Sequence, residues 1–368
     1  MTSFLRRFLQ VESASSVVLL AAAAAALVWA NVSMASYGDF WHPHLQHWVN
    51  DGLMVVFFFV VGLEIKYELV EGDLRDPRTA ALPVVAAIGG MVVPALLYLA
   101  VAGRDAAAGW GIPMATDIAF AVGVLGLLGS RLPSAARLFL LTLAIVDDIG
   151  AIVVIAVFYT DDLALGWLAA AVGGLLVVVG LRVAGVRWWL PYLAVGVLVW
   201  LALLQSGVHA TLAGVALGLL TPAATAAGLQ QRVHPLSAYV VLPVFALANA
   251  GVALGSGVLD GDGSAAVALG VGAGLVLGKP LGILLACFVA VRVRLARLPD
   301  GVGWAQLTGI GAVAGIGFTV SLFIAGLSFP DAPALTEAAK VGVLAGSVLA
   351  AAAGLALLAR VSPRQPPC

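Results

Sequence analysis

Two adjacent aspartates, Asp147 and Asp148, lie near the middle of the apolar run 138–159. On insertion scales, one charged carboxylate at the centre of a membrane helix costs about 2.5–3.5 kcal/mol, so two neighbouring ones indicate a functional site. Successive residues of a helix point about 100° apart, so one carboxylate can meet a partner helix while the other faces a cavity. The pair therefore predicts a buried site that binds a cation or a proton.

A second polar stretch, residues 111–117, contains Gly111, Pro113, Thr116 and Asp117 within an apolar segment. Proline removes a backbone hydrogen-bond donor and disturbs the preceding helical turn. Hydrocarbon cannot satisfy backbone groups freed in this way, so protein or water must line the stretch. Hard cations prefer hydroxyl, carboxylate and carbonyl oxygens. Thr116 and Asp117 are therefore candidate ion ligands beside the aspartate pair.

One lysine, Lys279, lies in a Gly-Lys-Pro sequence near the middle of the apolar segment 266–291. At that depth the side chain cannot easily extend to water, so its charge must be neutralised or paired. The available partners are Asp117, Asp147 and Asp148. We expect Lys279 to compensate the charge of one of them.

Three further titratable side chains lie near segment ends. Glu64 and Glu68 are four residues apart at the end of segment 50–70 and share a helix face. They form either a solvated helix end or a funnel that attracts cations. His209 lies near the start of segment 207–220, where a hydrogen-bonded structural histidine is favoured over a proton-responsive one.

The region between Trp41 and Trp48 is rich in histidine, with His42, His44 and His47. Such a cluster could bind a metal, but tryptophan at a membrane boundary favours an interfacial belt. We therefore predict no resident metal at these histidines.

The composition is that of a membrane protein that crosses the bilayer many times. Of the 368 residues, 62% are hydrophobic and 10% are charged, compared with about 25% charged in soluble proteins. We predict an all-α protein of about twelve transmembrane helices. The twelve apolar segments cover residues 13–30, 50–70, 79–101, 107–129, 136–159, 163–181, 189–204, 207–220, 236–253, 266–291, 304–328 and 336–359.

The sequence gives no sign of nucleic-acid binding, of a disulfide framework or of a bound cofactor. A net charge of −1 offers no basic surface for nucleic acid, and two cysteines do not suggest a disulfide framework. Gly309, Gly311 and Ala314 superficially match a dinucleotide-binding loop, but no strand or downstream acid accompanies them. Small-residue helix packing explains them better, and we expect no cofactor.

Lysine and arginine set the predicted orientation. The connections between successive segments lie alternately on the two sides of the membrane. Apart from the intramembrane Lys279, only Arg104 and Lys340 fall on one side, and the remaining basic residues fall on the side that also holds both termini. Basic residues concentrate on the cytoplasmic side, so both termini are predicted to be cytoplasmic. Residues 1–35 could be a secretory signal, but we favour a retained first helix because Glu12 is unusual in a signal peptide.

The segments 107–129 and 304–328 are both interrupted by glycine or proline. Each is the middle segment of a group of three consecutive segments. The two groups span residues 79–159 and 266–359. Paired interruptions of this kind are typical of inverted repeats in transporters, whose binding site lies where the broken helices meet. We predict one transmembrane domain, residues 1–368, with these two approximate repeats.

Six short motifs in one order connect the chain to a known family. They are Val-Gly-Leu-Glu at 61–64, Thr-Asp-Ile-Ala-Phe-Ala at 116–121, Ala-Ile-Val-Asp-Asp at 144–148, Ser-Gly-Val-His-Ala-Thr at 206–211, Gly-Lys-Pro-Leu-Gly at 278–282 and Gly-Ile-Gly-Phe-Thr at 315–319. In these motifs the chain resembles the NhaA-type Na⁺/H⁺ antiporters of bacterial inner membranes. The resemblance covers nearly all of the segments.

The resemblance implies a transporter rather than an enzyme, with broken fourth and eleventh helices that cross near mid-membrane. It implies electrogenic export of Na⁺ or Li⁺ driven by H⁺ entry, for sodium, pH and salt homeostasis, in a lipid membrane. Asp148 would be the principal Na⁺ ligand and Asp147 its partner in proton exchange. Thr116 and Asp117 would contribute at the crossing, and Lys279 would be the compensating cation.

The chain departs from the family pattern in two places. The family's pH-responsive cytoplasmic cluster has acidic and histidine residues before the ninth helix, where this chain has Gln230 and Gln231 and keeps His234. Tyr67 also replaces a basic residue there. The first external loop is shorter than in the member whose β-hairpin holds a dimer together. The candidate pH-responsive residues are thus Glu64, Glu68, His209 and His234, and a homodimer is one possible assembly.

Two other functions fit parts of the pattern. A sodium-coupled symporter of an organic anion would need anion-binding donors, and Lys279 is the only intramembrane cation. An intramembrane aspartyl protease could use Asp117 with Asp148, but its Gly-x-Gly-Asp signature is absent. Antiport is therefore the function that we expect.

Overall fold

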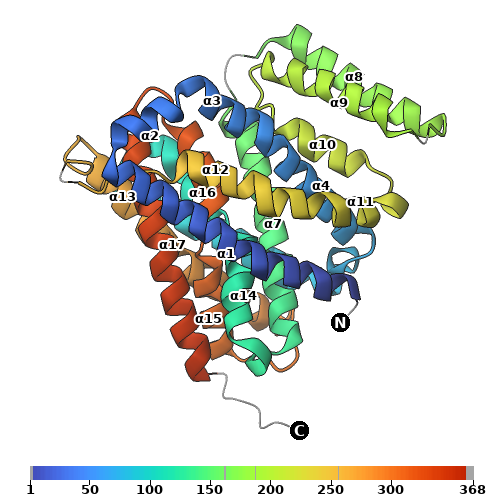
Figure 1. Ribbon diagram of the computed structural model, residues 1–368. Coiled ribbons are helices and arrows are strands. Elements are labelled where there is room, and N and C mark those ends of the chain that lie inside the picture. The colour runs from blue at the N-terminus through green and yellow to red at the C-terminus, as the bar shows by residue number, and fades with distance from the viewer. Residues whose placement is uncertain (1–2, 161–162, 187, 256, 362–368) are drawn as a thin grey trace.

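The computed structural model describes residues 3–160, 163–186, 188–255 and 257–361, which form helices and no β-strand (Figure 1). The α-helices are α1 (Ser3–Val32), α2 (Met34–Phe40), α3 (Pro43–His47), α4 (Met54–Val70), α5 (Pro77–Ala102), α6 (Ile118–Leu127), α7 (Ser134–Phe158), α8 (Leu165–Val183), α9 (Trp189–Leu204), α10 (Leu212–Leu220), α11 (Ala223–Leu236), α12 (Leu242–Asn249), α13 (Ser264–Ala273), α14 (Lys279–Arg292), α15 (Trp304–Ala314), α16 (Phe318–Ser328) and α17 (Pro333–Val361). Short 3₁₀ or π segments are η1 (Trp48–Leu53), η2 (Asp73–Arg75), η3 (Ala107–Met114), η4 (Gly129–Arg131), η5 (Ser237–Val241) and η6 (Gly274–Gly278).

The helices confirm a polytopic, all-α membrane protein. Within the described residues, six helical spans are long and apolar enough to cross a bilayer, and there are eight if each of two bent pairs counts as one span. The six are 14–32, 77–102, 134–158, 165–183, 264–292 and 333–361. Other apolar segments form shorter helices such as α9 and α10. Twelve crossings therefore stay a prediction.

Both segments that the sequence marks as interrupted are broken in the structure. The axes of η3 and α6 differ by 40°, and those of α15 and α16 differ by 48°. The two breaks meet, because the Asp117 backbone N–H donates to the Ile316 carbonyl at 2.6 Å. One backbone donor and one backbone acceptor that the breaks would expose thus satisfy each other. The assignment of two inverted repeats stays a prediction that this correspondence supports.

Most of the region 221–233, which lies between the predicted apolar segments 207–220 and 236–253, is helical. It forms most of α11, after Pro222 in an extended conformation. Four alanines in the first turns explain the helix, since alanine has the highest helix propensity. α11 continues through the π turn η5 into α12 and so extends one wall of the site described below.

Glycines allow the closest helix contacts. A Cβ atom built on Gly89 of α5 would lie 2.3 Å from the Gly282 carbonyl oxygen of α14, and one on Gly282 would lie 2.1 Å from that of Gly89. Small residues of this kind let membrane helices approach at backbone distance. The contact matters for the site because Lys279 lies one turn before Gly282 on the same helix.

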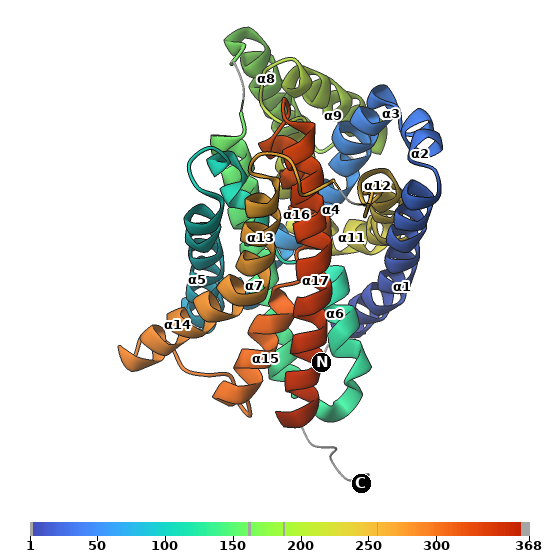
Figure 2. The ribbon, with the colours of Figure 1, turned by 90° about the vertical axis from the view of Figure 1, so that its left-hand side faces the viewer.

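The first helix is part of the packed bundle, whereas α8 and α9 lie at its edge (Figures 1 and 2). Leu19, Ala23 and Ala26 of α1 are buried in the main apolar core. At the end of α1, the Asn31 side chain donates to the Val252 carbonyl at 2.8 Å and accepts from the Leu254 N–H at 2.7 Å. α1 therefore packs on the core through these residues and is hydrogen-bonded to the connection after α12.

Candidate functional site

Asp147 meets a partner helix. Its Oδ2 atom lies 2.7 Å from Lys279 Nζ, and neither side chain has any exposed surface. The Thr116 hydroxyl lies 2.7 Å from the same oxygen and 2.8 Å from the Ala314 carbonyl. One hydroxyl hydrogen serves both acceptors, so Thr116 can donate to Ala314 whenever Asp147 carries a proton. Asp147 thus has one cationic and one hydroxyl neighbour.

Lys279 connects three elements. Besides the Asp147 carboxylate on α7, its ammonium group donates to the carbonyl of Met114, the last residue of η3. A positive charge is favourable at this carbonyl end of a helical segment. The π turn η6 ends directly before Lys279, and Pro280 follows without an N–H of its own. π turns occur often at functional sites, and this one ends immediately before Lys279.

Asp117 caps two helices at once. Its Oδ1 accepts from the Phe120 N–H of α6 at 3.0 Å. Its Oδ2 accepts from the Thr319 N–H at 3.0 Å and the Thr319 hydroxyl at 2.7 Å, at the start of α16. Gly317, at the N-cap of α16, has no side chain with which to cap it. A carboxylate stabilises the positive N-terminal end of a helix, and here one carboxylate serves two.

Asp148 faces a cavity instead of a helix. The cavity has a volume of about 40 Å³, enough for a few water molecules, and is lined by Phe57, Val60, Glu64, Thr116, Asp117, Ile118, Ala119, Asp148, His234, Ser237, Ala238, Leu242, Thr319 and Val320. Among the described residues, Asp148 Oδ1 has no hydrogen-bond partner. This buried oxygen is therefore available to a proton or a cation.

Two of the four candidate pH-responsive residues line the same cavity. Glu64 projects from α4 and His234 from α11, and both line the cavity together with Asp148. Gln230, one turn before His234, donates from Nε2 to Glu64 Oε1 at 3.2 Å. The glutamine thus places a neutral amide against the buried carboxylate.

The other two candidates lie elsewhere. Glu68 Oε2 accepts from the Asp73 N–H at 2.9 Å, below the cavity at the end of α4. Burial raises the pKa of Asp73, and a hydrogen bond with Thr142 partly lowers it. His209 lies near the opposite end of α4, close to Asp51, and the Asp51 carboxylate pairs with His47 at 2.9 Å. The structure therefore does not bring Glu68 or His209 to the aspartate pair.

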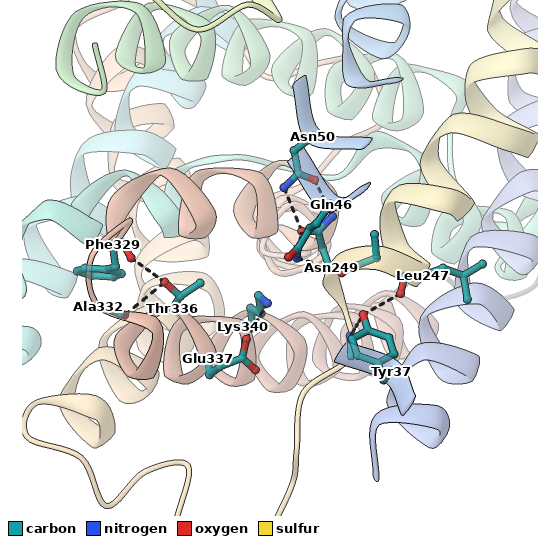
Figure 3. A network of polar contacts seen from close by, with 12 residues as sticks. Tyr37, Gln46, Asn50, Leu247, Asn249, Phe329, Ala332, Thr336, Glu337 and Lys340 are labelled. Atoms are coloured by element: carbon teal, nitrogen blue, oxygen red, sulfur yellow. Dashed lines mark hydrogen bonds and ion pairs between the residues drawn. The ribbon is translucent and has the colours of Figure 1, made fainter. Parts of the chain in front are cut away.

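A polar network occupies the end of α4 that is remote from Glu64 (Figure 3). The Asn249 amide donates to Asn50 Oδ1 at 2.8 Å and accepts from Gln46 at 3.2 Å. On α17, Lys340 and Glu337 pair at 2.8 Å.

Aromatic rings separate this network from the cavity. Along the helices, Phe58, Phe245 and Phe323 lie between the two, and the Phe323 ring is 5.5 Å from Phe58 and 6.4 Å from Phe245 between centroids. Three aromatic side chains in contact therefore lie between the cavity and the network along these helices.

Several residues of the site were not among the sequence candidates. Thr319 holds Asp117, and Ser237 lines the cavity. Thr319 lies just after the interruption of segment 304–328, and Thr116 lies within the interruption of segment 107–129. The paired interruptions could therefore have identified Thr319 as a site residue. The carbonyls of Met114 and Ala314 could not be identified, because any residue provides a carbonyl and only tertiary structure selects one.

Two broken helices that meet beside buried carboxylates define a secondary ion transporter. Comparison with known proteins gives the same class and narrows it. The family described as Na⁺/H⁺ antiporter 1 matches residues 6–358, and the chain belongs to this family. Membership places it among multi-pass bacterial membrane transporters and sets aside the aspartyl protease alternative.

Named relatives extend over nearly the whole chain. The protein is 50% identical to the Na⁺/H⁺ antiporter NhaA 2 of Pseudomonas syringae pv. syringae, with 98% of this chain and 96% of that protein aligned. It is 50% identical to the Na⁺/H⁺ antiporter NhaA of Acidovorax sp., over 96% of this chain and 91% of the relative. It is 48% identical to the Na⁺/H⁺ antiporter NhaA of Shigella dysenteriae, over 96% of this chain and 97% of the relative.

Proposed function

We propose that this protein is a secondary antiporter that exports Na⁺ or Li⁺ from the cell in exchange for H⁺, and that Asp148 is its principal ion ligand. The observation that carries the proposal is the Asp148 carboxylate, which faces the cavity beside the helix crossing with one oxygen unpartnered. Thr116 lines the same cavity, and its hydroxyl provides a neutral oxygen beside Asp147. Hard cations prefer ligands of this kind.

Exchange follows from competition for the same oxygens. A proton on the Asp148 carboxylate removes the anionic ligand, and a bound cation opposes protonation. Asp147 is the partner in proton exchange, since its carboxylate contacts both Lys279 and Thr116. Two nearby acids titrate as a coupled system. If both release protons for one Na⁺, each cycle moves net charge and the transport is electrogenic.

The pH response is assigned to groups near this cavity. Glu64 and His234 line the cavity with Asp148, and a change in their charge alters the potential that an entering cation experiences. Glu68 and His209 could act only over a longer range. Because Gln230 carries no charge, Glu64 and His234 form a smaller titrating set than the family's cluster.

The distribution of basic residues supports a location in the bacterial inner membrane with both termini in the cytoplasm. Exposed leucines and valines on α8 and α9 provide the surface for surrounding lipids. Homodimerisation stays a prediction from the resemblance. In place of a long hairpin, the first loop holds the short helices α2 and α3.

The function is tested in everted membrane vesicles that hold a respiration-driven pH gradient. We expect Na⁺ and Li⁺ to collapse the gradient, and K⁺ to leave it unchanged. Na⁺-dependent uptake of a labelled organic anion, with no collapse of the gradient by Na⁺ alone, would instead establish the symporter. The cavity lining in the described chain contains no lysine or arginine to bind such an anion.

A further inference from the structure

One face of α14 and the turn before it is apolar and open to the membrane. Leu277, Leu281, Leu285 and Phe288 are each more than half exposed and recur every three or four residues. This spacing places them in one line along the helix. Arg292 follows four residues later and continues the same line to the helix end. The stripe thus offers an apolar path for an acyl chain that ends at a guanidinium group.

The chain beyond Arg292 alternates charge with apolar surface. Arg292, Arg294 and Arg297 are exposed, and so are Val293 and Leu295 between them. In the described part of the chain, no ion pair or side-chain hydrogen bond involves these three arginines. Figure 2 shows this end of α14 projecting away from the other helices. Their charges are therefore directed toward partners outside the protein.

The backbone at Arg294 is unusual. It is the only described residue other than glycine with a positive φ, at 60°. The Leu295 N–H donates to the Ala290 carbonyl at 2.9 Å, a bond of the Schellman motif that ends many helices. In this motif the residue with the left-handed conformation, here Arg294, is usually glycine. A side chain in this conformation is strained relative to glycine. The strain indicates that an arginine at this position has a function that glycine could not provide.

Depth in the membrane agrees with a headgroup contact. Lys279 lies at the helix crossing, which in transporters of this architecture is near the bilayer midplane. Thirteen residues of α-helix separate Lys279 from Arg292, a rise of about 20 Å. The hydrocarbon half-thickness is about 15 Å, so even a tilted α14 brings the arginines to the lipid phosphates. Trp304, whose ring lies 6.0 Å from that of Phe288, is of the type that anchors helices at this level.

We propose that Arg292, Arg294 and Arg297 form a binding site for the phosphate of an anionic phospholipid, whose acyl chain lies along the Leu277 to Phe288 stripe. Guanidinium groups bind phosphate oxygens through paired hydrogen bonds. The apolar stripe provides the contact that a free phosphate lacks. The partner is therefore an intact anionic lipid, such as phosphatidylglycerol.

The test uses the full-length protein purified in detergent. Its melting temperature is measured with added phosphatidylglycerol, with phosphatidylcholine of the same acyl chains, and with inorganic phosphate. We expect a larger upward shift with phosphatidylglycerol than with either of the others, and a smaller difference at high salt. In the triple variant R292Q/R294Q/R297Q this extra shift should be lost. An unchanged extra shift in that variant would overturn the proposal, and so would a full shift with phosphate alone.

Two single variants complete the design. Arg78→Gln removes an exposed arginine from the predicted cytoplasmic side, at the start of α5, and should keep the extra shift. Arg294→Gly replaces the strained residue with the one that suits its backbone. It should therefore melt no lower than wild type without lipid, yet respond less to phosphatidylglycerol. Equal losses in Arg78→Gln and Arg294→Gly would show a general charge effect and contradict a site on α14.

Discussion

Asp147 and Lys279 form an ion pair of 2.7 Å with no exposed surface on either side chain. Removal of one member of a buried pair leaves an uncompensated charge, which is strongly destabilising in proteins. The pair links α7 to α14, and the Lys279 ammonium also reaches η3 through the Met114 carbonyl. The contact is therefore structural as well as a means of charge compensation.

Lys279→Ala should lower both stability and transport without abolishing transport. The buried Asp147 carboxylate loses its cation, so the unfolding free energy should fall by about 3 kcal/mol and the pH profile of transport should shift. Thermal melting in detergent and Na⁺-induced dequenching at several pH values measure the two effects. If the double variant Asp147→Asn with Lys279→Ala is no more stable than Lys279→Ala alone, the pair does not act as described.

Asp117→Ala should impair folding or transport more than Thr319→Val. The aspartate caps α6 and α16 together, whereas Thr319→Val removes only the hydroxyl bond to Asp117. Loss of one cap costs about 1 kcal/mol, and two caps should cost about twice that. Melting temperatures at matched expression give the comparison. Equal stability of the two variants would contradict the double cap.

Gly282→Ala should separate α14 from α5 and move Lys279. The added methyl would lie 2.1 Å from the Gly89 carbonyl oxygen, a contact that backbone can relieve only by moving apart. Overpacking of this kind costs about 1–3 kcal/mol. Gly173→Ala on α8 is the matched control, because nothing lies within 4 Å of its added methyl. Since alanine favours helix, the control should melt no lower than wild type.

The apparent affinity for Na⁺ should rise with pH across the neutral to alkaline range. Protons occupy the carboxylates at lower pH and leave them as pH rises, so less Na⁺ is then needed. Where one proton competes, the half-maximal Na⁺ concentration falls about tenfold for each pH unit. Titrations of Na⁺-induced dequenching at several pH values measure it. A half-maximal concentration independent of pH would contradict the competition.

Local rules were sufficient for some features of the site. The 100° spacing of adjacent helical residues predicts that Asp147 and Asp148 diverge, and in the structure one meets Lys279 while the other faces the cavity. The two breaks are also visible in the sequence, because glycine and proline interrupt otherwise apolar segments. Pro113, however, lies inside η3, and the extended backbone is confined to the residues after it.

Other features depend on tertiary contacts that no local pattern contains. Lys279 had three possible partners, and only the tertiary structure pairs it with Asp147, directly after the π turn η6 and one turn before the close approach of Gly282 to Gly89. The double cap by Asp117 likewise needs α6 and α16 to begin side by side. Glu68 and His209 share titratable chemistry with the site, but their positions along α4 and before α10 keep them away from the cavity.

The most direct test of the account is Na⁺-induced dequenching by Asp148→Asn in everted vesicles at matched expression. Asparagine keeps the shape of the side chain but removes the negative charge that offsets dehydration of the ion. Asp161 and Asp162, between the predicted segments 136–159 and 163–181, are outside the described residues. Asp260→Asn and Asp262→Asn, in the exposed loop before α13, therefore serve as controls. We predict no Na⁺-dependent proton exchange by Asp148→Asn and unchanged exchange by both controls; full exchange by Asp148→Asn would contradict the assignment of the ion site.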